Sequence, residues 1–209
     1  MITLLVTGFG PFPGAAFNPT GLLVRQLAKV RRPTLADVTV VTHVFPTSYA
    51  AVDRDLPKLI AEHKPDALLM FGLATRAKCV RIETRARNAL ALLPDATSTT
   101  LRRHVIAPGA PTASKMPVPG RRLLALLRGT GIPATLSRDA GRYLCNYLCW
   151  RAAAATAQVH GPRLAAFIHV PPVRRGARPR HASRPHLSLD DLARVGGSLL
   201  IGLASAARR

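Results

Sequence analysis

The chain has 209 residues, 48% apolar and 5% aromatic, with a formal net charge of +20 from 30 Lys and Arg against 10 Asp and Glu. This length favours a single domain over residues 1–209. No run of about 18 uncharged apolar residues occurs, so we expect no membrane span. The arginines are scattered and lack interleaved aromatic residues, which favours compositional drift over nucleic-acid binding as the origin of the charge.

The N-terminal segment and the cysteines bear on the cellular compartment in which the chain is expected. The opening MITLLVTGFG has no basic residues before its apolar run and does not resemble a signal peptide. The three cysteines, Cys79, Cys145 and Cys149, are odd in number and lack the spacing of a zinc site. We therefore expect a cytoplasmic protein with free thiols and no metal.

Predicted strands and helices alternate along the chain. Strands are expected at 2–9, 37–45, 66–73, 79–92, 133–138 and 163–170, and helices at 19–32, 48–63, 119–129, 142–158 and 188–207. Asn18 before Pro19 is a typical helix start, and Ser188 is expected to cap the last helix. Residues 93–118 are expected to be irregular, and 171–186 form a basic, proline-rich loop. This order predicts an α/β fold, a three-layer α/β/α sandwich with an open, twisted and mostly parallel sheet.

Functional sites of such sheets lie beyond the carboxyl ends of the strands. The loops at 9–18, 72–79, 138–145 and 170–186 are therefore expected to meet. The segment GRYLCNYLCW places Cys145 at the start of a helix, where the helix dipole and free N–H groups favour a thiolate. The Asn146 amide and nearby main-chain N–H groups can supply an oxyanion site.

Cys149 lies one turn deeper and is expected to pack in the core beside Trp150. A nucleophilic Cys145 needs a base, and His169 ends the strand at 163–170. A histidine in that position serves either as this base or as a structural hydrogen-bonding group.

A third, orienting group would be acidic, and the chain has two glutamates, Glu62 and Glu83. The arginines around Glu83 favour an exposed carboxylate paired with Arg81 or Arg85. A role for Glu83 in orienting a catalytic histidine stays open as the alternative.

Four segments resemble, in order, the motifs of the pyroglutamyl peptidase I family, also called pyrrolidone carboxyl peptidases. They are TGFGPFPGAAFNPT, GLATRAKCVRIETRARN, GIPATLSRDAGRYLCNY and FIHVP, and they span nearly the whole chain. The resemblance implies a cytoplasmic cysteine peptidase of open α/β fold that needs no cofactor and removes pyroglutamate from peptides with this blocked N-terminus. It also implies a homo-oligomer, either a dimer or a tetramer.

The same resemblance implies roles for individual residues. Cys145 would be the nucleophile, His169 the general base and then acid, and Glu83 the group that orients the imidazole. Phe9 and Phe12 of the first loop would hold the pyrrolidone ring. The complete set predicted to bind substrate is Phe9, Phe12, Asn18, Leu73 and Asn146.

The chain also departs from the family pattern. The departures are Pro13 for Gly, Arg76-Ala77 for Gly-Arg, Thr84 for Arg, and NALALLPDA at 88–96, which lacks an active-site arginine of the family. Either Arg85 or Arg87 replaces that arginine or its role is lost. Two alternatives therefore remain: a divergent homologue that acts on another acyl-amide or only binds its ligand, and a nucleic-acid-binding protein.

Overall fold

The computed structural model of the chain describes residues 1–174 and 187–209. A six-stranded sheet contains β1 (Ile2–Phe9), β2 (Val38–Phe45), β3 (Ala67–Leu73), β4 (Val80–Glu83), β7 (Ala134–Ser137) and β8 (Leu164–Val170). A separate pair contains β5 (Arg85–Arg87) and β6 (Ala113–Lys115). The helices are α1 (Pro19–Leu27), α2 (Tyr49–His63), α3 (Gly120–Arg128), α4 (Leu144–Thr156) and α5 (Leu189–Ala207), with a 3-10 turn η1 (Pro33–Leu35).

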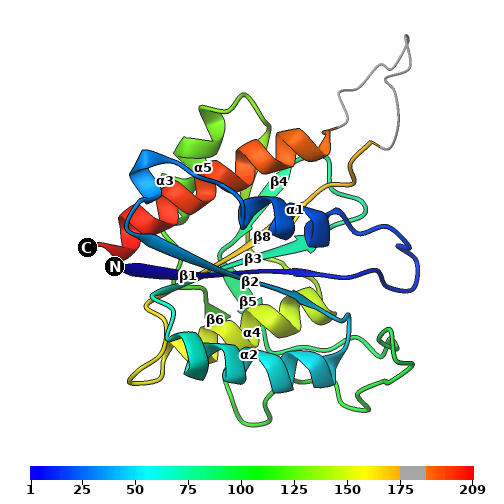
Figure 1. Cartoon of the computed structure of the whole chain (residues 1–209). Helices are drawn as coiled ribbons and strands as arrows, with labels where there is room; N and C mark the ends of the chain where they lie inside the picture. Colours follow the sequence, from blue (N-terminus) through cyan, green and yellow to red (C-terminus); the bar gives the residue numbers. More distant parts are fainter. Residues whose placement is uncertain (175–186) are drawn as a thin grey trace.

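The order of the sheet is β2-β1-β3-β8-β4-β7. The four strands from β2 to β8 are parallel, whereas β4 runs antiparallel to β8 and parallel to β7. Helices α1, α3 and α5 cover one face of the sheet, and α2 and α4 lie on the other together with β5 and β6 (Figure 1). The predicted three-layer fold with a mostly parallel open sheet is confirmed.

Two apolar cores fill the space between the sheet and its helices. The central strand β3 contributes to both, because successive side chains of a strand point to opposite faces. Leu69 and Phe71 pack against the α1, α3 and α5 side, and Leu68 and Met70 pack against the α2 and α4 side. Burial on both faces explains why this strand is apolar throughout.

The predicted helix starts are confirmed. Oδ1 of Asn18 accepts a hydrogen bond from the Thr20 N–H, and Pro19 occupies the first turn of α1. Ser188 and Asp191 form a capping box at the start of α5. Helix α1 ends at Leu27, five residues earlier than expected, because the chain turns toward η1, which opens at Pro33.

The expected strand at 79–92 is wrong in its extent. It breaks at Thr84, whose N–H and hydroxyl both donate to the carbonyl oxygen of Ser137. The chain then leaves the sheet and forms β5, which pairs with β6 inside the segment expected to be irregular. The basic loop prediction at 171–186 falls mostly on residues 175–186, which lie outside the described residues.

Among the described residues, no helix combines the length and the apolar character needed to cross a membrane.

Candidate active site

A cavity of about 230 Å³ lies at the carboxyl ends of β1, β3 and β8 and at the start of α4. Its lining comes from Phe9, Phe12, Asn18, Thr47, Leu73, Ala74, Thr75, Ala140, Gly141, Arg142, Tyr143, Leu144, Cys145 and His169. The loops at 9–18, 72–79 and 138–145 therefore meet, as the strand order predicts. The cavity contains both the predicted nucleophile and the predicted base.

Cys145 lies in the first turn of α4, one residue after the helix begins. Gly141 has a φ of 83°, a left-handed conformation that glycine adopts without strain, and it turns the chain toward the helix. The side chain of the N-cap residue, Tyr143, makes no capping hydrogen bond to the N–H groups of the first turn. The thiol therefore lies beside N–H groups that can bind negative charge.

Gly72, in β3, leaves the space that the Cys145 sulfur occupies. A Cβ atom built at Gly72 would lie 2.8 Å from Sγ of Cys145 and 2.7 Å from Cζ of Phe167. Both distances are shorter than real Cβ contacts. Any larger residue at this position would displace the thiol or the ring, so Gly72 is a positioning residue that sequence reasoning missed.

His169 and Glu83 form a buried pair at the floor of the cavity. Nδ1 of His169 lies 2.9 Å from Oε1 of Glu83, a hydrogen-bonding distance. His169 is 6% exposed and Glu83 is fully buried. Since Nδ1 bonds the carboxylate, Nε2 is the nitrogen left for the thiol.

The groups around His169 stabilise its protonated, positively charged form. Burial by itself lowers the pKa of His169, but the charge and hydrogen bonding of Cys145 and Glu83 outweigh burial and raise this pKa to about 9. Within the described part of the chain, Oε2 of Glu83 forms no hydrogen bond. A buried carboxylate with so few partners needs a nearby cation, and the His169 imidazolium provides it.

The expectation of an exposed Glu83 paired with Arg81 or Arg85 is wrong. Strand β4 pairs with β8 so that Glu83 lies opposite Phe167 and diagonal to His169, within reach of a long side chain. The arginines next to Glu83 in sequence are not its partners, because the pairing of β4 with β8 brings the His169 side chain closer.

Four of the five predicted substrate-binding residues line the cavity: Phe9, Phe12, Asn18 and Leu73. Phe9 also packs against Phe45, with ring centroids 5.8 Å apart. The Asn18 side chain is already engaged, since its amide donates to the Gly10 carbonyl and its oxygen accepts from Thr20. Asn18 therefore fixes the shape of the first loop.

The Asn146 side chain, predicted to help form an oxyanion site, is engaged away from the cavity. Asn146 is fully buried and does not line the cavity. Its Oδ1 accepts from the Arg87 N–H at 2.8 Å, and its Nδ2 donates to the carbonyls of Arg87 and Ala89. The side chain points from α4 toward β5 and connects these two segments.

Cys149 is fully buried in the core on the α4 side, as predicted, and Trp150 is buried in the same cluster. Burial raises the pKa of the Cys149 thiol well above its ordinary value, and the nearby Cys145 and Glu83 add to this effect. The two cysteines one turn apart thus have opposite environments. All three cysteines are free thiols.

Sequence reasoning also missed Arg142 and Tyr143, which both line the cavity. Arg85 and Arg87, proposed as substitutes for the absent family arginine, line a neighbouring hollow instead. Arg142 lines both spaces, so it is the arginine among these three that reaches the cavity. The signal was available, because Arg142 lies between Gly141 and Tyr143 in the cysteine motif.

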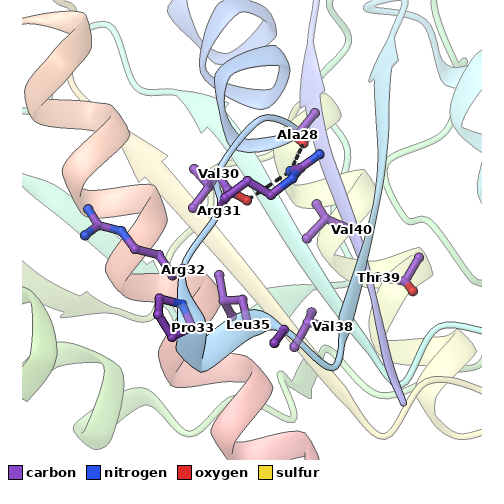
Figure 2. A pocket seen from close by; sticks show the side chains of 10 residues that line it. Ala28, Val30, Arg31, Arg32, Pro33, Leu35, Val38, Thr39 and Val40 are labelled. Carbon is purple, nitrogen blue, oxygen red and sulfur yellow. Dashed lines mark hydrogen bonds between the residues drawn. The ribbon is translucent and has the colours of Figure 1, made fainter.

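Another hollow, of about 630 Å³, lies between the end of α1, η1 and β2 (Figure 2). Arg31 extends over it and donates hydrogen bonds to the carbonyls of Ala28 and Val30. The described residues that line it include no Cys, His, Asp or Glu. This hollow therefore offers neither a thiol nor an acid–base side chain. Across the described residues, no group of three His, Cys, Asp or Glu side chains could hold a metal ion.

An open α/β sheet with a cysteine at a helix start, beside a buried histidine–glutamate pair, defines the class of cysteine hydrolases. The sequence pattern of one such family, described as pyroglutamyl peptidase, matches residues 2–207. The chain therefore belongs to the pyroglutamyl peptidase family of cysteine peptidases, which confirms the resemblance seen in its motifs.

Individual relatives agree with this assignment. The pyrrolidone-carboxylate peptidase of Pyrococcus furiosus is 36% identical over 169 residues, 80% of each chain. That of Pseudomonas fluorescens is 34% identical over 175 residues, which are 82% of this chain and 79% of the other. The solved structure of the Thermococcus litoralis pyrrolidone carboxyl peptidase superimposes with a TM-score of 0.86 at 28% identity, covering 100% of this chain and 96% of that chain.

Proposed function

We propose that this chain removes an N-terminal pyroglutamate residue from peptides, with Cys145 as nucleophile, His169 as general acid and base, and Glu83 as the group that orients His169. The observation that carries the proposal is the cavity in which Cys145 and His169 meet Phe9 and Phe12. Two aromatic rings in the lining of a small cavity suit a flat, five-membered lactam ring.

Acylation begins with the ion pair of the Cys145 thiolate and the His169 imidazolium. The sulfur attacks the carbonyl carbon of the pyroglutamyl residue, a C–S bond forms, and the carbonyl oxygen becomes an oxyanion. When the carbonyl re-forms, the C–N bond breaks, and Nε2 of His169 gives its proton to the departing amine. The high pKa of His169 keeps this proton available at neutral pH.

Deacylation reverses the proton transfer. A water molecule gives a proton to Nε2 of His169 and attacks the thioester carbonyl. Collapse of this second intermediate breaks the C–S bond, releases pyroglutamic acid and restores the thiolate–imidazolium pair. Main-chain N–H groups in the first turn of α4 are the candidates for stabilising both oxyanions, because the Asn146 side chain is engaged elsewhere.

The experiment is the release of a fluorescent amine from a pyroglutamyl amide. The wild-type chain should release it, and Cys145→Ala should lower the rate at least about a thousandfold. Cys149→Ala is the matched control, one turn deeper and buried, and should retain the rate. No release by the wild type, or equal release by Cys145→Ala, would contradict the proposal and favour a divergent homologue that only binds its ligand.

Three further expectations accompany this function: a single domain over residues 1–209, a cytoplasmic location and a homo-oligomer, dimer or tetramer. The three free thiols agree with a reducing compartment. Light scattering of the purified chain would measure the number of subunits directly.

A further inference from the structure

Two hollows lie beside β5 and β6, and the first of them adjoins the active-site cavity. The first, of about 320 Å³, is lined by Arg85, Arg87, Asn88, Ala89, Thr112, Ala113 and Arg142. The second, of about 340 Å³, is lined by Thr84, Arg85, Ala113, Ser114, Lys115 and Arg138. They share Arg85 and Ala113, and Arg142 lines both the first hollow and the cavity of Cys145. Because the two hollows share Arg85 and Ala113, we treat them as one surface, here named the basic groove.

The groove has an excess of positive charge. It is lined by five cationic side chains, Arg85, Arg87, Lys115, Arg138 and Arg142. Among the described residues, one of these five side chains forms an ion pair: Nη1 of Arg87 lies 3.4 Å from Oδ2 of Asp139.

Some arginines elsewhere on the surface lie beside acidic partners. Examples are Arg151 with Asp53, Arg194 with Asp191 and Arg208 with Asp37. Within the described part of the chain, Arg85, Lys115, Arg138 and Arg142 form no ion pair, so most of the positive charge of the groove is not neutralised by an acidic side chain.

The part of the substrate that leaves the cavity beside Arg142 would come into contact with these cationic side chains. The ring of a pyroglutamyl substrate would occupy the cavity, so the residues after the scissile bond must leave it. Arg142 lies where the cavity meets the groove. Guanidinium groups bind carboxylates through paired charge-assisted hydrogen bonds, which neutral side chains do not offer.

We propose that the basic groove binds the part of the substrate that follows pyroglutamate and selects peptides with a carboxylate directly after the scissile bond. The inference rests on the proposed function and specifies its substrate class. The carboxylate can come from an Asp or Glu side chain or from the C-terminus of a dipeptide, since both present the same anion.

The test compares kcat/KM for three substrates: pyroglutamyl-glutamate amide, pyroglutamyl-glutamine amide, and pyroglutamyl-glutamine with a free C-terminus. The first two differ in one charge and hardly in shape. At low salt the glutamate amide should be cleaved about fivefold faster than the glutamine amide. The difference should disappear near 1 M salt, where charges are screened within about 3 Å. The third substrate shows whether a C-terminal carboxylate gives the same gain.

Variants locate the effect. Arg142→Gln and Arg85→Gln should each reduce the glutamate-to-glutamine ratio toward one. Arg128→Gln, at the last turn of α3 on the other side of the sheet, removes the same charge and should leave the ratio unchanged.

Each failure has its own meaning. Equal kcat/KM for the glutamate and glutamine amides, with clear hydrolysis of both, would overturn the inference alone. So would a ratio that neither groove variant changes. Hydrolysis of none of the three substrates by the wild type would overturn the proposed function and the inference with it.

Discussion

The three proposed catalytic residues and the basic margin beside them, residues 84–116, are held in place by different means. Cys145 is placed by the start of a helix, His169 by the end of a central strand, and Glu83 by the pairing of β4 with β8. Each position depends on main-chain hydrogen bonds of regular elements, which many sequences can form.

The margin depends instead on single polar side chains. Asn88 bonds the main chain of Ile106, Ala107 and Ala110. Asp95 accepts from the N–H groups of Tyr49, Thr97 and Thr99, and it thereby caps α2 from a distant loop. The third such polar side chain is that of Asn146, which bonds the main chain of Arg87 and Ala89 and so fixes the margin to α4.

The difference teaches how such an enzyme can diverge. Two of the four departures from the family pattern, Thr84 and 88–96, fall in the margin, and the other two, Pro13 and Arg76-Ala77, lie in loops outside it. Cys145, His169 and Glu83 match the pattern. Residues beside the active site can change without displacing the proposed catalytic residues, because regular elements of the sheet and of α4 hold these three in place. The following predictions test that independence, from the largest expected effect to the smallest.

Glu83→Gln should lower kcat/KM about a thousandfold, because a neutral amide neither orients the imidazole nor stabilises its cation. Glu62→Gln is the matched control, since Glu62 is the chain's other glutamate and lies exposed on α2 beside His63. Steady-state kinetics on a pyroglutamyl amide would measure both. A loss of less than tenfold for Glu83→Gln would show that the Glu83 carboxylate does not orient or stabilise the His169 imidazolium.

Gly72→Ala should lower kcat about a hundredfold, since the added methyl group must displace the Cys145 sulfur or the Phe167 ring. Gly197→Ala in α5 is the control, because a Cβ there meets no atom within 4 Å. The alkylation rate of Cys145, measured beside kcat, reports the displacement directly. Unchanged kcat and alkylation would refute the positioning role of Gly72.

Asn146→Ala should lower the free energy of unfolding by about 2 kcal/mol, because three main-chain groups of the margin lose their partner. Asn88→Ala should cost a similar amount. Urea denaturation followed by circular dichroism would measure both. If Asn146→Ala retained its stability but lost catalysis, Asn146 would be an oxyanion group after all, and the two regions would not be independent.

The pH profile should show a basic limb near pH 9, where His169 loses the proton it gives to the departing amine. Above this pH, kcat/KM should fall about tenfold per unit. Glu83→Gln should move the limb to lower pH, because the carboxylate helps to raise the pKa of His169. An unmoved limb in a variant with measurable rates would assign the titration to another group.

The sequence predicted what local patterns determine. The layers of the fold could be predicted from the apolar strands, the Asn18 and Ser188 caps and the alternation of strands and helices. The cysteine motif was sufficient to separate Cys145 from Cys149. These features depend on residues close together in the chain.

Features set by distant pairing were not predictable from the chain alone. The burial of Glu83 depends on β4 running antiparallel to β8, and local charges suggested the opposite. The bond from Asn146 to Arg87 joins residues 59 apart in sequence. The placement of Arg142 between cavity and groove requires the fold of the β5–β6 pair.

The antiparallel direction of β4 has a further consequence for access to the site. Because β4 runs against β8, Glu83 lies level with Phe167, two residues deeper in the sheet than His169. From the cavity inward, exposure decreases from the partly buried Cys145 through His169 to the fully buried Glu83. The imidazole thus shields the carboxylate, so that buffer anions, peptides and alkylating inhibitors can reach the thiol while the charge that orients its partner stays out of their reach.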